Sequence, residues 1–111
     1  MVIGWSSPFG GATRTRVLLA LQLLSDSYPR ELARVLDAPI SGVLKALRSL
    51  ELDGLVAGRT MGRMRFFRIN PSYFAVAPLR EYLEQLTLPE EELRKRVSQL
   101  RRRPRRTGKR F

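Results

Sequence analysis

Apolar residues recur at helical spacing in two segments of the first 36 residues. The first segment starts near Thr13, a residue type that caps helix N-termini, and its apolar positions are Val17, Leu18, Leu21 and Leu24. The residues "SDSY" interrupt this spacing, and Pro29 then fits the first turn of a second helix. The apolar side of the second segment is Leu32, Ala33, Val35 and Leu36. The pattern therefore predicts two helices joined by a short turn.

A third helical pattern occupies "ISGVLKALRSLELDGLV", residues 40 to 56. Ile40, Val43, Leu47 and Leu50 are spaced i, i+3, i+7 and i+10, which aligns them in one stripe. Lys45 and Arg48 lie outside the stripe, and Gly54 is suited to end the helix. We predict a helix of about 13 to 15 residues, an ordinary length for a globular protein, with one packed face and one polar face. Leu44 either widens the packed stripe, which we favour, or faces outward.

After this helix, the apolar residues alternate with polar ones at every second position instead of following helical spacing. This alternation predicts a β-hairpin. Leu55–Arg59 and Met64–Ile69 are the expected strands, and "TMGR" is the turn between them. We expect Phe67 and Ile69 to pack inward and Arg65 to lie at the rim. Only one of the adjacent residues Phe66 and Phe67 can face outward, so we favour core packing over base stacking for this pair.

Two more helices are predicted after the turn "NPSYF". The first runs from about Val76 or Pro78 to Leu86, with Leu79, Tyr82, Leu83 and Leu86 at helical spacing. The second starts with Pro89 and three glutamates, continues into arginines, and stops at Pro104. Acids near the N-terminus and cations near the C-terminus of a helix suit its dipole.

The amino-acid composition excludes several classes of function. The 111 residues include no cysteine and no histidine, so metal sites built on thiolate or imidazole are excluded. The acids show no ligand spacing, and no phosphate-binding loop or nucleophile with a nearby base occurs. We therefore expect no metal, no cofactor and no enzymatic activity. With no long apolar run and no signal peptide, we expect a soluble, cytoplasmic, nucleoid-associated protein.

The net charge of +11 is unevenly distributed. Ten of the 21 Lys and Arg residues lie between Leu93 and Phe111, a segment without Asp or Glu. Residues 1–92 carry 11 cations and 10 acids, a net charge of about +1. A basic tail binds any polyanion through counterion release, without reading sequence. The tail therefore predicts added affinity for nucleic acid but does not identify the target.

Three helices followed by a basic hairpin are the order of a winged helix-turn-helix. In "YPRELARVL", "ISGVLKALRSLELDGLV" and "GRTMGRMRFFRINP", the chain resembles ArsR-like bacterial regulators over roughly residues 14 to 72. The resemblance implies a mainly α fold with a small β-hairpin wing, an α+β architecture with additional C-terminal helices. We divide the chain into a flexible lead-in (1–12), a DNA-binding domain (13–72), C-terminal helices for possible dimerisation (73–103) and a disordered basic tail (104–111).

The resemblance also implies which residues meet double-stranded DNA. The third helix would enter the major groove and the wing would approach the minor groove and phosphates. Lys45 and Arg48 would reach guanine, and Leu44, if it faces outward, would reach a thymine methyl group. The implied contacts are Ser41, Gly42, Lys45 and Arg48 on the helix, Arg59, Arg63 and Arg65 on the wing, and Arg14 and Arg16, which equally suit a covering role on the first helix.

Relatives of this type pair through their terminal helices, so a homodimer is expected. The candidate interface residues are Val17, Leu21, Leu79, Tyr82, Leu83 and Leu86, which suit the core of one chain equally well. A dimeric transcriptional repressor acting by promoter occlusion is the function we favour. The alternatives are a winged-helix protein-interaction adaptor and a protein that coats nucleic acid through its tail. No residue pattern identifies an effector or an operator.

Overall fold

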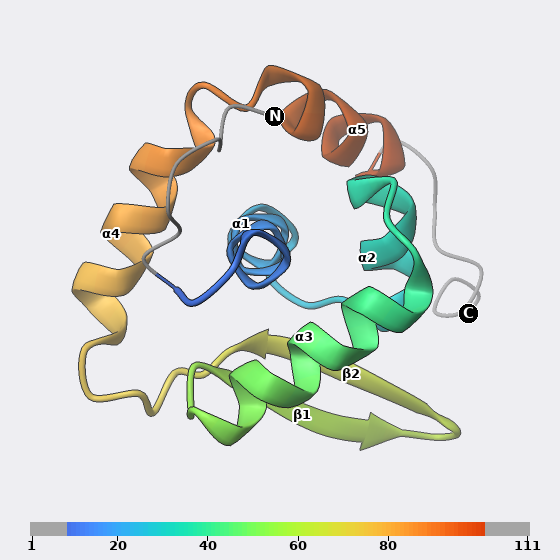
Figure 1. Cartoon of the computed structure of the whole chain (residues 1–111), viewed down its shortest axis with the longest axis vertical. Helices are drawn as coiled ribbons and strands as arrows, with labels where there is room; N and C mark the ends of the chain where they lie inside the picture. Colours follow the sequence, from blue (N-terminus) through green and yellow to red (C-terminus); the bar gives the residue numbers. More distant parts are fainter. Residues whose placement is uncertain (1–8, 102–111) are drawn as a thin grey trace.

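The computed structural model describes residues 9–101 and confirms the predicted fold class (Figure 1). Within this range the elements are α1 (Ala12–Leu24), α2 (Pro29–Leu36), α3 (Ile40–Leu52), β1 (Val56–Met61), β2 (Met64–Ile69), α4 (Val76–Thr87) and α5 (Glu91–Arg101). Most of the predicted flexible lead-in and the whole of the predicted basic tail lie outside the described residues. The order of three helices, hairpin and two helices is the predicted one.

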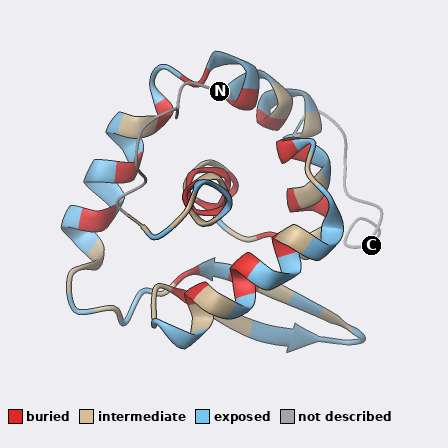
Figure 2. Cartoon of the chain, viewed as in Figure 1, coloured by how far each residue is buried: buried red, intermediate tan, exposed pale blue. Residues whose placement is uncertain are grey.

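Helix α1 lies in the middle of the molecule, with α2, α3, α4, α5 and the hairpin around it (Figure 1). Much of α1 has the colour of buried residues in Figure 2, and Leu19 and Ala20 are as fully buried as Val17, Leu18 and Leu21. A helix that is apolar on all sides is expected at such a position. The predicted apolar positions, Val17, Leu18, Leu21 and Leu24, are buried, and Leu19 and Ala20 join them. The predicted cap was wrong, because the helix begins after Gly11 and Thr13 lies in its first turn.

The short segment between α1 and α2 ties the helices to the hairpin. Ser27 exchanges two backbone hydrogen bonds with Phe67 of β2, at 3.0 and 2.7 Å. Its hydroxyl group donates to the carboxylate of the buried Glu31, in the first turn of α2, at 2.7 Å. Pro29 begins α2 as predicted. The base of the hairpin is thus fixed to the start of the second helix.

Helix α3 packs one face against α1 and α2 through Val43, Leu47 and Leu50, as predicted, and through Ala46. Gly54 follows the helix with a φ of 79°. Its N–H and that of Leu55 bond to the carbonyl groups of Glu51 and Leu50, the pattern that commonly closes a helix at glycine. Ile40 is 41% exposed, so its assignment to the packed stripe was wrong.

The hairpin pairs Val56 with Ile69 at its base and Met61 with Met64 at its tip. The first strand is therefore shifted from the predicted Leu55–Arg59, and a two-residue turn replaces the predicted four. Gly62 has a φ of 63° at the first turn position, where a tight hairpin requires glycine. Phe67 and Ile69 are buried, as predicted.

Helices α4 and α5 share one core with the winged helix. Leu79, Leu83, Leu93 and Val97 belong to the same buried cluster as the residues of α1. Two arginines of α5 also satisfy carbonyl groups at the ends of other helices: Arg96 bonds to Val35 and Arg101 to Leu23. Among the described residues, no helix has the length and apolar character that would let it cross a membrane.

Candidate nucleic-acid interface

The side of α3 opposite the core is exposed and carries two cations. Ser41, Leu44, Lys45 and Arg48 are all exposed, and helical spacing puts them on one side of α3. The side chains of Lys45 and Arg48 make no hydrogen bond or ion pair with any described residue. Leu44 is 41% exposed, so the favoured prediction that it widens the core stripe was wrong. This face combines unpaired positive charge with exposed apolar groups.

The first turn of α3 has no side-chain cap. Pro39 precedes the helix in an extended conformation, and its side chain offers no acceptor to the first N–H donors. Ser41 and Gly42 lie in this turn, and a Cβ atom built on Gly42 meets nothing within 4 Å. The turn therefore presents backbone donors and a small surface, which is the environment that phosphate groups occupy at helix N-termini.

The acids at the other end of α3 are engaged in ion pairs. Both carboxylate oxygens of Glu51 face the guanidinium group of Arg65, at 2.8 and 3.4 Å. Asp53, directly after the helix, pairs with Arg14 at 2.7 Å. The described residues contain no group of three or more acids arranged to hold a metal ion. The negative charge at this end of α3 is thus directed at the chain's own arginines, whereas Asp37, just before the start of α3, is exposed and forms no ion pair with a described residue.

The wing arginines differ in how firmly they are held. Arg65 pairs with Glu51, and its guanidinium carbon lies 5.0 Å from the centre of the Phe67 ring. Gly58 makes room for this arrangement, because a Cβ atom there would lie 2.5 Å from a nitrogen of Arg65. Arg59 pairs with Asp26 at 2.8 Å. Both pairs are similarly exposed, where ion pairs contribute little, so the Phe67 ring and the second bond to Glu51 are what distinguish Arg65.

The tip of the wing carries the remaining predicted cation. Arg63 is exposed in the turn and has no ion-pair partner among the residues that the structure describes. Of the three predicted wing contacts, Arg63 is therefore free to contact phosphate. Arg59 can give up its weak ion pair with Asp26, whereas Arg65 is held in the wing by Glu51 and the Phe67 ring.

Arg14 and Arg16 connect α1 to other elements. Arg14 bonds to the backbone of Phe9, to the hydroxyl group of Ser49 and to Asp53, and its side chain is only 18% exposed. Arg16 donates to the carbonyl group of Leu36 at the end of α2. Of the two roles left open for these residues, the structure places both in the covering one.

Three exposed cations near this region were not among the predicted contacts. Arg30 and Arg34 are exposed on α2, and Arg68 is exposed on β2. None of them forms an ion pair with another residue in the range 9–101. The sequence carried a signal that could have identified them. Arg30 and Arg34 lie outside the apolar stripe of α2, and Arg68 alternates with the apolar residues Phe67 and Ile69 of β2.

The residues predicted for a dimer interface divide into two groups. Val17, Leu21 and Leu83 are completely buried inside the single chain, so their assignment to an interface was wrong because they have no surface to offer. Leu79 is also buried, and Leu86 is partly buried against the core. Tyr82 is exposed on α4.

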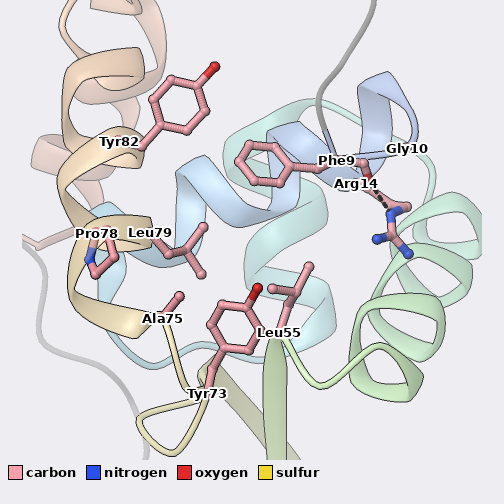
Figure 3. A pocket seen from close by; sticks show the side chains of 9 residues that line it. All are labelled: Phe9, Gly10, Arg14, Leu55, Tyr73, Ala75, Pro78, Leu79 and Tyr82. Atoms are coloured by element: carbon pink, nitrogen blue, oxygen red, sulfur yellow. Dashed lines mark hydrogen bonds between the residues drawn. The ribbon is translucent and has the colours of Figure 1, made fainter.

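A groove of about 610 Å³ runs beside Tyr82, between α4 and the residues that precede α1 (Figure 3). Three aromatic rings line it, those of Phe9, Tyr73 and Tyr82. Phe9 and Tyr82 approach each other across it, with ring centres 5.9 Å apart. Arg14 borders the groove while its guanidinium group points toward α3 (Figure 3).

Comparison with solved structures identifies proteins of the same fold. A variant of ZitR from Lactococcus lactis superposes with a TM-score of 0.58 and 18% identity, over 90% of this chain and 76% of that one. A ZitR variant in its apo form gives 0.54 and 19%, over 73% and 64%. The adhesin competence repressor AdcR from Streptococcus pyogenes gives 0.54 and 20%, over 83% and 75%.

The chain thus spans between 64% and 76% of the length of these structures. No protein-family model matches the sequence, and no curated protein matches it. The winged-helix fold is shared with ZitR and AdcR.

Proposed function

We propose that this protein is a sequence-specific, duplex-DNA-binding transcriptional regulator. The observation that carries the proposal is the charge arrangement on α3: Lys45 and Arg48 are exposed and unpaired among the described residues, while Glu51 pairs with Arg65. An α-helix fits the major groove of B-DNA, where lysine and arginine bind guanine. The shared fold with a protein named as a repressor supports the same function.

In this proposal α3 enters the major groove and the wing lies over the flanking minor groove and phosphates. Ser41 and the backbone of Gly42 bind phosphate at the start of α3, and Arg63 binds it at the tip of the wing. Arg59 joins when its exposed pair with Asp26 opens. Arg30 and Arg34 of α2 add phosphate contacts next to α3. The basic residues after Arg101 add affinity that is independent of sequence.

A homodimer that occludes a promoter is the mode of action we favour. Two copies related by twofold symmetry would place two recognition helices about one DNA turn, roughly 34 Å, apart. Tyr82 and the neighbouring surface of α4 are the part of the predicted interface that remains accessible. The mass of the protein in solution, measured by sedimentation, tests this step together with the symmetry of the bound sequence.

The experiment that tests the proposal is selection from a random duplex library, using residues 1–101, at roughly 150 mM salt so that non-specific binding is suppressed. We expect an enriched, roughly palindromic motif. On that motif, Lys45→Ala or Arg48→Ala should each cost about 1 to 3 kcal/mol of binding free energy. Arg80→Ala is the matched control, because Arg80 is an exposed cation on α4. A cost below about 0.3 kcal/mol for both α3 variants contradicts the assignment.

A protein-interaction adaptor is the second candidate function. The exposed apolar side chains of Ile40 and Leu44 favour it, since such groups also serve protein interfaces. An adaptor without its tail should bind no duplex with preference. A coating protein should lose nearly all nucleic-acid binding when the tail is removed, so the same selection separates a regulator from both alternatives.

A further inference from the structure

The exposed face of α3 offers an incomplete set of groups for reading bases. The helix, "ISGVLKALRSLEL", contains no asparagine, no glutamine and one acid, Glu51. Glu51 is paired with Arg65, and Asp53 beyond the helix is paired with Arg14. The accessible side chains toward the N-terminal half are therefore two cations, one hydroxyl group and two apolar groups.

Each base presents different chemistry in the major groove. Guanine accepts hydrogen bonds from arginine or lysine, and cytosine donates a hydrogen bond to a carboxylate. Adenine forms two hydrogen bonds with the side-chain amide of asparagine or glutamine. Thymine presents a methyl group that packs against an apolar side chain. The α3 face has donors for guanine and apolar groups for thymine, but it lacks amide groups for adenine and free carboxylates for cytosine.

The apolar groups lie among the cations. Leu44 is one helical turn from both Ile40 and Arg48, and it adjoins Lys45 in sequence. Residues four apart are neighbours on a helix surface. Ile40 and Leu44 are both 41% exposed, so each has apolar surface left to bury. The rise along four helical residues, about 6 Å, covers one to two base pairs.

We infer that α3 reads guanine and thymine on neighbouring base pairs, with Leu44 packing against a thymine methyl group. Arg48 and Lys45 bind guanine next to it, and Ile40 extends the apolar contact toward the start of the helix. This inference rests on the proposed function and specifies its ligand: duplex DNA whose contacted strand combines these two bases. Leu44 is then a residue that determines specificity.

The test replaces the methyl group and the leucine separately. In the duplex selected by the protein, thymine is exchanged for uracil, which lacks the methyl group, one position at a time. At the contacted position the exchange should weaken binding of the unchanged protein about fourfold, since burial of one such group is worth about 0.8 kcal/mol. Leu44→Ala should weaken binding to the thymine duplex, and it should abolish the difference between thymine and uracil.

The chain provides a matched control. Leu52 is an exposed leucine at the other end of α3, 83% accessible, and Leu52→Ala should leave the difference between thymine and uracil unchanged. Equal binding of thymine and uracil duplexes at every position, or independent effects of uracil and Leu44→Ala, would overturn the inference alone. Failure to select any duplex sequence would overturn the proposed function and the inference together.

Discussion

At Gly42, one substitution should affect protein stability and DNA binding in opposite directions. Nothing in the folded chain opposes a side chain there, since a Cβ atom meets no neighbour within 4 Å. Gly42→Ala should therefore raise the free energy of unfolding by about 0.5 to 1 kcal/mol, because alanine favours a helix over glycine. If the backbone of this turn approaches phosphate, the same variant binds DNA more weakly.

Chemical denaturation and binding of the selected duplex measure the two effects of Gly42→Ala. Gly11→Ala is an informative comparison, because a Cβ atom at Gly11 also meets nothing within 4 Å, and Gly11 precedes α1 rather than α3. A Gly42→Ala protein that is more stable and binds DNA with unchanged affinity would contradict the phosphate contact.

Two arginines with different surroundings should behave in opposite ways. Arg14 joins Phe9, Ser49 and Asp53, so Arg14→Ala should cost about 1 to 2 kcal/mol of unfolding free energy, as expected for hydrogen bonds to a charged group. Arg63→Ala should change stability by less than about 0.5 kcal/mol. For DNA binding, Arg63→Ala should reduce the salt slope by about 1. An Arg14→Ala protein of unchanged stability would show that Arg14 does not hold α1 to the end of α3.

The contrast between these arginines shows what the sequence could predict at the residue level. Exposed cations outside the apolar stripes, such as Lys45 and Arg48, were identified correctly as exposed because helical spacing determines which face a residue occupies. Arg14 was left undecided because its partners Ser49 and Asp53 are distant in sequence. Leu44 was assigned to the wrong side because an apolar residue next to a stripe gives no local sign of exposure.

At the level of elements, the ion pair between Glu51 and Arg65 links α3 to β2 of the wing. Arg65 is held by this carboxylate, by the Phe67 ring and by the space at Gly58. Glu51→Gln removes a negative charge, so electrostatics alone would strengthen binding to DNA. We predict weaker binding, by up to about fivefold, because the loosened wing loses its fixed position and an exposed pair is worth at most about 1 kcal/mol.

Amide hydrogen exchange in β1 and β2 of the free protein should be faster in Glu51→Gln, which tests the wing without DNA. Glu81→Gln on α4 is the control of equal charge change, since Glu81 is exposed. It should bind DNA with equal or slightly higher affinity. Tighter DNA binding by Glu51→Gln would mean that the carboxylate merely repels phosphate.

Most element boundaries were predictable because periodicity and turn residues are local signals. Pro29, Gly54 and Gly62 marked a helix start, a helix end and a hairpin turn, as the structure confirms. The burial of Val17–Leu21 on all sides of α1 was not predictable, because it results from α4 and α5 closing over the side left open by α2 and α3. The same closure explains why Val17, Leu21 and Leu83 are core residues rather than interface residues.

For the whole molecule, residues 1–101 carry 15 cations and 10 acids, a net charge of about +5, and a tail that contains only cations follows them. Truncation should separate the contributions of these two parts to DNA binding. Residues 102–111 contain six cations and no acid, whereas Arg96 and Arg101 of α5 bond to carbonyl groups of α2 and α1. Truncation after Arg101 should therefore leave the fold intact. It should reduce the salt slope of DNA binding by up to about 5, because each phosphate that the tail neutralises adds about 0.9 to that slope.

Truncation after residue 92 provides the comparison that tests this division of roles. It removes Leu93 and Val97 from the core together with the bonds made by Arg96, so it should lower the melting temperature, which truncation after Arg101 should not. The sequence preference must survive in the longer truncated protein if α3 reads the bases. If preference disappears with residues 102–111, the tail is the binding element and the winged helix serves another partner.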